Sequence, residues 1–360
     1  MARKLAYDRV LFTAVIVLVG LGLTMVYSAS AVFARDQGRP INPFLVKQSV
    51  AAFLGLVAMW IAMHVDYRHL RRPAVLYSLV AGVLVLLVVI LFGPELNSSR
   101  RWLLLGGLSI QPSELAKLAV IVFVAYQIEQ QQRESHRDLV LSCAPLLGLI
   151  AALILLQPDL GTAVLICAAA LLMLFLAGVR WSYFTAAGLA LLPALWFLVY
   201  SVPYRRKRLL AFLDPDLDPL NAGYQARQSL IAVGSGGVFG LGLGEGVQKL
   251  YFLPHPHSDF IFSIVAEELG LVGALGVLAL FGVLLWRGVV AGVRAPDLFG
   301  RYLAWGLTGI LVLQALVHVS VALALMPTKG IPLPFVSYGG SSLVVSMTAS
   351  GMLLNVSQHG

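Results

Sequence analysis

Residues 10–33 read VLFTAVIVLVGLGLTMVYSASAVF, an apolar run of about 24 residues with no charged side chain. A helix that crosses the hydrocarbon core of a bilayer needs about 20 such residues. The run follows the short basic stretch MARKLAYDR, is longer than the apolar core of a signal peptide, and shows no small-residue cleavage site. We therefore predict a retained first membrane span and not a cleaved leader.

Apolar runs of this kind recur along the chain. Its 360 residues are 59% hydrophobic and 12% charged, with a mean hydropathy of +0.88, whereas soluble domains are about 25% charged. This composition predicts an all-α polytopic membrane protein, a single integral membrane domain over residues 1–360 with about ten transmembrane helices. The predicted spans are 10–33, 44–64, 74–93, 113–128, 139–156, 160–178, 182–201, 259–286, 302–325 and 339–357.

The basic residues predict the orientation of these spans. An even number of spans puts both termini on one side, and Lys and Arg are enriched in cytoplasmic loops. The side of the termini carries twelve, namely Arg3, Lys4, Arg9, Arg68, Arg71, Arg72, Arg133, Arg137, Arg180, Arg287, Arg294 and Arg301, and the short loops of the other side carry five, namely Arg35, Arg39, Arg100, Arg101 and Lys329. The bias predicts cytoplasmic termini. It also accounts for most of the net charge of +8, and without a basic stripe on a soluble module no nucleic-acid partner is expected.

Residues 202–258 form a long loop between the seventh and eighth spans, and in this orientation the loop lies outside the cytoplasm. It contains RRKR at 205–208, DPDLDP at 214–219, the amphipathic piece GYQARQSLIAV at 223–233, and the glycine tract GSGGVFGLGLGEG at 234–246. The tract does not follow a strand in a βαβ unit, so a dinucleotide-binding fingerprint is not indicated. We expect its glycines to permit tight turns and close backbone approach.

A few ionisable side chains lie at or near membrane depth, where such groups usually mark function. Glu114 and Lys117 open the fourth span in QPSELAK, Asp159 lies between the fifth and sixth spans in QPDLG, and Asp259 opens the eighth span. In the predicted topology all four lie near the outer leaflet. Charged groups from three distant segments are thus expected to converge at one depth.

Each of these residues also has a structural interpretation. Asp159 could cap the sixth helix, and Glu114 and Lys117, three residues apart, could form an ion pair on one helix face. Asp259 could cap the eighth helix with help from Ser258, although His255 and His257 nearby favour a functional role.

Other polar residues inside the spans are expected to be structural. At least one of Glu267 and Glu268 should pair with a basic or polar group. Gln314 and His318, four residues apart, are typical of an interhelical hydrogen-bond pair. Cys143 and Cys167 lie in apolar runs and are expected to be small packed side chains without a disulfide.

Five stretches in order along the chain resemble the SEDS family (shape, elongation, division, sporulation). They are PSELAK, QPDLGT, GYQARQSL, GVQKLYFLPHPHSDFIFSIVAEELG and MPTKGIPLPFVSYGGSS. GVQKL and the last stretch resemble the division branch (FtsW) more than the elongation branch (RodA). The family pattern LPExxTDF has Glu and Thr where this chain has His255 and Ser258. An acidic residue assisting Asp259 from position 255 is therefore absent, whereas Ser can replace Thr.

The resemblance implies a peptidoglycan glycosyltransferase that polymerises lipid II on the outer face of the bacterial cytoplasmic membrane, for septal wall synthesis. Asp259 matches the family's essential aspartate and is expected to be the general base for the acceptor hydroxyl. The leaving pyrophosphate needs positive charge, for which Lys117, Arg100 and Arg101 are candidates. Glu114 would orient Lys117, and Asp159 completes the predicted substrate-binding set.

The resemblance also implies partners and a cofactor. A divalent cation, Mg²⁺ or Mn²⁺, could bind at Asp259 beside the pyrophosphate, and the apolar spans could hold the prenyl chain. The expected protein partner is a class B penicillin-binding transpeptidase at the division site, with other division or elongation membrane proteins.

Three alternative functions remain open at this point. A lipid II flippase or transporter would also have many spans and buried charges, but it needs polar groups along a path through the whole bilayer. Here the polar groups gather at the outer end, which favours an enzyme acting on one face. An elongation-type polymerase would share the same chemistry, and a scaffold that only recruits partners would not need Asp259 and Lys117 at membrane depth.

Overall fold

The computed structural model describes residues 7–36, 42–93, 95, 100–105, 108–131, 135–218 and 221–360. In these residues the chain forms twelve α-helices and one two-stranded antiparallel hairpin, in which Leu104 lies opposite Ser109. The elements are α1 (Arg9–Asp36), α2 (Pro43–His64), α3 (Pro73–Val89), β1 (Leu103–Leu105), β2 (Leu108–Ile110), α4 (Pro112–Gln130), α5 (His136–Leu156), α6 (Leu160–Leu176), α7 (Trp181–Tyr200), α8 (Pro203–Leu213), α9 (Ala222–Ser235), α10 (Ile261–Arg294), α11 (Leu298–Ala322) and α12 (Gly340–Gln358).

The ten long helices, α1–α7 and α10–α12, coincide with the ten apolar runs. In the described part of the chain, seven helices are long and apolar enough to cross a membrane by length and composition, and α6 is a shorter apolar helix. The protein is thus an all-α polytopic membrane protein, and the exact number of spans stays a prediction. Of the basic residues used to predict its orientation, Arg3, Lys4, Arg39 and Arg133 lie outside the described residues, as does Pro219 of the acidic stretch.

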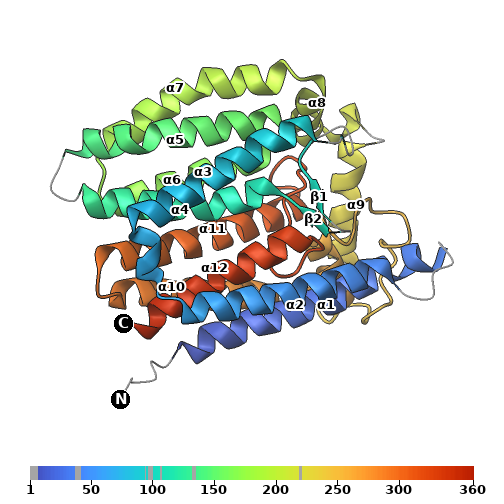
Figure 1. The fold of residues 1–360 in the computed structure, drawn as a ribbon. Helices are drawn as coiled ribbons and strands as arrows, with labels where there is room; N and C mark the ends of the chain where they lie inside the picture. Colours follow the sequence, from blue (N-terminus) through green and yellow to red (C-terminus); the bar gives the residue numbers. More distant parts are fainter. Residues whose placement is uncertain are drawn as a thin grey trace.

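The long helices run side by side in one bundle (Figure 1). The start of α1 and the end of α12 lie at the same end of this bundle, as an even number of spans requires. The Arg287–Asp8 ion pair (2.6 Å) ties α10 to the start of α1 there. The β hairpin, α8 and α9 lie at the opposite end, and α9 runs across the bundle axis. We call these the terminal end and the outer end.

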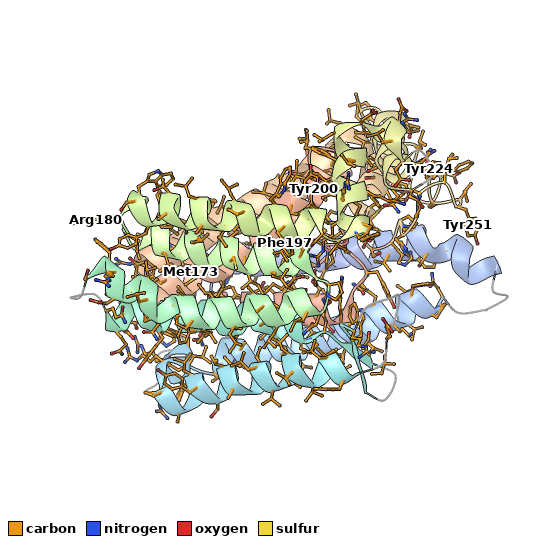
Figure 2. All side chains as sticks on the ribbon, turned by 90° about the horizontal axis from the view of Figure 1, so that it is seen from above. Met173, Arg180, Phe197, Tyr200, Tyr224 and Tyr251 are labelled. Atoms are coloured by element: carbon orange, nitrogen blue, oxygen red, sulfur yellow. The ribbon has the colours of Figure 1, made fainter. Side chains whose placement is uncertain are left out.

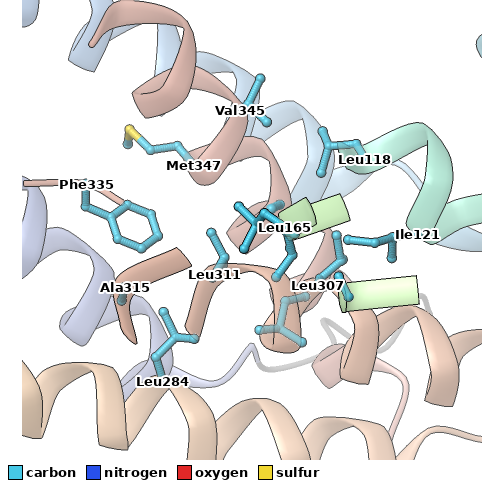
Figure 3. Packing of buried hydrophobic residues seen from close by; sticks show 14 of the residues in the cluster. Leu118, Ile121, Leu165, Leu284, Leu307, Leu311, Ala315, Phe335, Val345 and Met347 are labelled. Carbon is cyan, nitrogen blue, oxygen red and sulfur yellow. The ribbon is translucent and has the colours of Figure 1, made fainter. Parts of the chain in front are cut away.

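Helix α11 lies at the centre of the core, packed against α4, α6, α10 and α12. Figure 3 shows Leu307, Leu311 and Ala315 of this helix surrounded by buried apolar side chains of its neighbours, among them Ile121 and Leu165. Polar side chains on α4 and α11 that point into this core are therefore enclosed by protein and not by lipid.

Helix α7 stands at the edge of the bundle. None of its described side chains is buried, and Leu189, Leu192 and Phe197 are each more than half exposed. Figure 2 shows Arg180 at one end of α7 and Tyr200 at the other, with Tyr224 and Tyr251 farther toward the outer end. An apolar helix without a buried side is expected to face lipid over most of its surface.

Helix α10 is not the single continuous span predicted from residues 259–286. Gly270 has φ 67° and ψ −165°, which breaks the helix, and the second part continues to Arg294. Across the break, Leu271 N and Val272 N donate to Gly237 O and Val238 O (2.9 and 3.2 Å), while Leu241 N and Gly242 N donate to Glu267 O and Glu268 O (both 3.0 Å). The glycine tract therefore replaces the helical hydrogen bonds that the break removes.

The orientation can be tested by cysteine labelling in cells. We expect an impermeant maleimide added from outside to label Asp216→Cys, in the outer-end loop, and not Pro296→Cys, at the terminal end. Both native side chains are exposed, and the free Cys143 and Cys167 are replaced by alanine in the background. Labelling of Pro296→Cys alone would show that the orientation is the reverse of the predicted one.

Candidate active site

Asp259 lies at the outer end, in a loop that is docked on the segment between α11 and α12. Ser337 Oγ donates to Ser258 O (2.7 Å), and Tyr338 N donates to His257 O (2.9 Å). These bonds hold the two residues that precede Asp259. Asp259 is not the cap of the following helix, because the N-cap position of α10 is Phe260 and makes no side-chain capping bond.

Helix α2 supports the same loop from the other side. The buried Gln48 side chain donates to Ser337 O and accepts from Gly339 N (both 3.1 Å). Phe44 stacks near His257 and Tyr338, with ring centroids 4.7 and 5.3 Å away. These supports were not identified from the sequence, because Gln48 and Phe44 are about 290 and 210 residues from their partners.

The Asp259 carboxylate packs against the backbone of Gly330. A Cβ atom at position 330 would lie 2.9 Å from Asp259 Oδ2, so a larger residue there would displace the carboxylate. Burial raises the pKa of the Asp259 carboxyl, while His255, a hydrogen bond with Ser258 and the charge of Arg208 act to lower it. A carboxylate with a raised pKa is a stronger base toward a substrate hydroxyl.

Cationic side chains from α8 and from the loop before α12 lie near Asp259 and Asp159. Arg208 donates to Thr328 O (2.8 Å) and stacks over Tyr204. Lys329 directly follows Thr328 in the sequence. Burial lowers the pKa of Lys329, with Asp159 acting in the opposite direction and Arg205 and Arg208 adding to the lowering. The three cations therefore share one electrostatic environment.

Arg205, Arg208 and Lys329 were missed as site residues. From the sequence alone, RRKR indicates only a basic stretch of the external loop, and Lys329 only contributes to the charge bias that predicts topology. One local signal was present: Arg205 and Arg208 are three residues apart, which places them on one face of α8, while Arg206 and Lys207 are exposed on the other.

Asp159 has the structural role considered for it, that of a helix cap. Its Oδ1 accepts from Thr162 N (3.1 Å), so it is the N-cap of α6, and Thr162 Oγ1 donates to its Oδ2 (2.8 Å). Arg101 Nη1 lies 3.9 Å from Oδ2, and Arg101 also donates to Gln157 O and Pro158 O. Arg101 therefore lies beside Asp159, whereas Arg100 donates to Leu91 O and is exposed.

Glu114 and Lys117 form the expected ion pair, with 2.6 Å between Glu114 Oε2 and Lys117 Nζ and side chains that are 4% exposed. Lys117 Nζ also donates to Gln314 Oε1 (2.7 Å). Gln314 in turn donates to Pro332 O, and His318 bonds Ile331 O (2.8 Å). Gln314 and His318 are thus hydrogen-bonded as expected, but to a loop and a lysine and not to each other.

The segment Gly330–Pro332 therefore contacts two polar groups of residues. Asp259 packs on Gly330, while the Glu114–Lys117–Gln314 chain reaches Pro332 from below. Asp259, Arg208 and Lys329 thus lie near one another, with Arg205, Asp159 and Arg101 beside them, whereas Lys117 is buried with Glu114 and Gln314.

Glu267 and Glu268 are paired, as predicted. Glu268 accepts from Lys249 Nζ (2.6 Å) and Ser28 Oγ (2.7 Å). Glu267 Oε1 accepts from Val247 N and Gln248 N (2.8 and 3.0 Å). These contacts join α1, α10 and the loop that leads to Asp259.

The donor set at Asp259 limits how a metal ion could be held. Within the described ranges, no group of three or more His, Cys, Asp or Glu side chains is arranged to bind a metal. A divalent cation at Asp259 would therefore take most of its oxygen ligands from substrate phosphates and water, as Mg²⁺ commonly does.

Comparisons with known proteins agree with this architecture. Residues 8–360 match the family described as "Cell cycle protein", FTSW_RODA_SPOVE. The chain is 45% identical to "Probable peptidoglycan glycosyltransferase FtsW" of Geobacter metallireducens, covering 98% of this chain and 94% of that one. It is 42% identical to "Stage V sporulation protein E" of Bacillus subtilis, covering 99% and 98%.

Solved structures share the whole fold. One chain, from work on "structural coordination of polymerization and crosslinking by a peptidoglycan synthase complex", has a TM-score of 0.82 and 34% identity, with 98% of both chains covered. The Thermus thermophilus rod shape determining protein RodA has a TM-score of 0.72 and 32% identity, covering 98% of this chain and 97% of that one. The chain therefore belongs to the FtsW/RodA/SpoVE family of cell cycle proteins.

Proposed function

We propose that the chain is a peptidoglycan glycosyltransferase that polymerises lipid II at the outer face of the bacterial cytoplasmic membrane, as part of septal wall synthesis. The observation that carries the proposal is the placement of one carboxylate, Asp259, beside Arg208 and the Lys329–Gly330 segment at the outer end of an apolar bundle. The names of the relatives in the family support the same reaction class.

In the proposed reaction Asp259 takes the proton of an acceptor sugar hydroxyl. The hydroxyl oxygen forms a bond to the anomeric carbon of the donor glycan, and the bond from that carbon to the pyrophosphate oxygen breaks. The pyrophosphate leaves as an anion on its prenyl carrier. A buried base and fixed positive charge on the leaving side each lower the barrier by stabilising the charges that develop.

We assign the leaving anion to Lys329, Arg208 and Arg205, together with Arg101. They lie near Asp259 and Asp159. Among the described residues, the ion pair that these cations form with a carboxylate is the 3.9 Å contact between Arg101 and Asp159. Arg208 and Arg101 otherwise donate to backbone carbonyls. Arg100 is farther away and is given no direct part. Mg²⁺ or Mn²⁺ bound between Asp259 and the phosphates would add positive charge for the same purpose.

The flippase alternative receives less support from this arrangement. The charged groups near Asp259 gather at the outer end, and the deeper Glu114–Lys117 pair is enclosed on all sides by packed helices. A transport path would need polar groups continuing to the terminal end. An elongation-type role differs in partners and timing and is not distinguished by the site.

The proposal also covers the protein partner and the location of the chain in the cell. The relatives include a chain from a peptidoglycan synthase complex, which supports a class B penicillin-binding transpeptidase as partner. The termini are assigned to the cytoplasm, and the division site is the proposed location.

The pH dependence of polymerisation tests the role of Asp259. Activity of a general base falls as the pH is lowered through its pKa, and Arg208 holds the Asp259 pKa down. We therefore expect Arg208→Gln to shift the acid limb of the kcat profile to higher pH. Lys207→Gln, on the exposed face of the same helix, should leave the limb in place. An identical acid limb in both variants would contradict the proposed base.

The anion assignment predicts a specific kinetic defect in Lys329→Gln. A hydrogen bond to a charged group contributes about 1.5–3 kcal/mol, so kcat/KM for lipid II should fall about tenfold or more. Lys207→Gln again is the matched control. Steady-state kinetics with labelled lipid II measure the effect, and wild-type kcat/KM in the Lys329 variant would remove it from the site.

A further inference from the structure

The glycine tract carries several large apolar side chains that are exposed although they lie outside any helix. Phe239 is 84% exposed, and Val238 and Leu243 are more than half exposed. The predicted topology treats residues 202–258 as one external loop in water. Apolar side chains gathered in this way need a cover other than water.

The tract is attached to α10 at a defined level. Gly237 O and Val238 O accept from Leu271 N and Val272 N, and Leu241 N and Gly242 N donate to Glu267 O and Glu268 O. A Cβ at Gly240 or Gly270 would lie 2.1–2.3 Å from backbone atoms of the other segment. The two backbones are therefore in direct contact, and the tract has the same depth as residues 267–272.

That depth can be counted from the terminal end. Asp8 pairs with Arg287 there, and Ser28 bonds Glu268 at the other end of the same two helices. The interval Asp8–Ser28 on α1 corresponds to about 30 Å at 1.5 Å per residue. Placing the Asp8–Arg287 pair at the inner boundary of a hydrocarbon core that is also about 30 Å thick puts the Ser28–Glu268 contact at its outer boundary.

Gly237 and Val238 lie below this boundary. They bond Leu271 and Val272, which follow Glu268 and the break at Gly270 in the direction of the terminal end. Leu271, Val272 and Leu275 are exposed apolar residues on α10, so the lipid-facing surface of the helix continues directly into the exposed face of the tract.

The backbone of the tract is suited to that position. Irregular backbone at membrane depth requires its polar groups to be bonded within the protein, and the four hydrogen bonds to α10 do this at the deepest point. After the tract, Lys249, which is 4% exposed, fastens the chain to α10 again. It pairs with Glu268 and donates to Gly244 O. The charged pair is thus enclosed while the apolar side chains face outward.

We propose that residues 237–243 form a re-entrant edge that dips into the outer leaflet and contacts lipid acyl chains. The edge leads through Lys249 to the loop of Asp259, so it fixes the height of that carboxylate relative to the membrane. The inference concerns the membrane contact alone and does not depend on the reaction assigned to the site.

Spin-label accessibility in lipid nanodiscs tests the proposal. Phe239→Cys and Val238→Cys are labelled with a nitroxide in the chain whose Cys143 and Cys167 are replaced by alanine. Leu275→Cys on α10 is the lipid reference and Asp216→Cys in the outer loop is the aqueous reference. Oxygen partitions into lipid, whereas a charge-neutral nickel chelate stays in water.

We expect labels at 238 and 239 to follow Leu275, with high collision rates for oxygen and low rates for the nickel chelate. Nickel-chelate rates like those at Asp216 at both positions would overturn the proposal. So would an aqueous signal in the chain alone that is lost only when a transpeptidase partner is added, because the edge would then be covered by protein.

Discussion

The Asp259→Asn variant should be inserted and bind its partners, yet form no glycan polymer. Asn is nearly isosteric with Asp and keeps one hydrogen-bond acceptor, so the docking of the loop through Ser337 and Tyr338 is retained. An amide cannot take the proton of the acceptor hydroxyl. Loss of a positioned general base typically lowers the rate about 100- to 10,000-fold, which reduces polymer to the background of the assay.

A gel of products from labelled lipid II measures this loss. Asp216→Asn is the matched control, because Asp216 is an exposed carboxylate between α8 and α9, and these two helices lie at the outer end of the bundle (Figure 1). It should give polymer of wild-type length. Polymer of normal length and rate from Asp259→Asn would remove this carboxylate from catalysis.

Lys117→Ala should lose both stability and activity. Its ammonium and the Glu114 carboxylate are 4% exposed and 2.6 Å apart, and removing one member of a buried pair costs about 3–5 kcal/mol because the other charge is left unpaired. The stability loss goes beyond the sequence interpretation, in which Lys117 only contacts the donor pyrophosphate. Thermal unfolding in detergent and polymerisation assays measure the two effects.

The double variant Glu114→Gln/Lys117→Met separates the two roles of Lys117. Neutral side chains of similar length remove the unpaired charge, so much of the lost stability should return. If Lys117 also binds the pyrophosphate, the double variant is stable and still inactive. Recovery of polymerisation together with stability would make Lys117 purely structural and leave the anion to Lys329 and the arginines of α8.

Local patterns in the sequence were sufficient for the helices and for one ion pair. Long apolar runs predicted each of the ten long helices because hydrophobic length is a local property. The three-residue spacing of Glu114 and Lys117 likewise predicted their contact. The cap at Asp159 could also be anticipated, since the bond to Thr162 is local.

Contacts between distant segments could not be predicted in this way. Gly270 is one of several glycines in its run, and only the glycine tract, about 30 residues earlier, shows why the helix breaks there. Gln314 is 197 residues from Lys117, and Arg208 is 120 residues from Thr328. Asp259 was identified by its charge at the start of an apolar run and received its role from the family resemblance, whereas the cations around it required the fold.

Polymerisation in detergent micelles is the most direct test of the central claim. A micelle has no two sides, so transport of lipid II cannot produce a signal and only catalysis yields polymer. We predict that the purified chain with its transpeptidase partner converts labelled lipid II into long glycan strands in micelles. Absence of polymer from the complex in micelles, together with movement of labelled lipid II across liposome membranes that contain it, would contradict the account and identify the chain as a transporter.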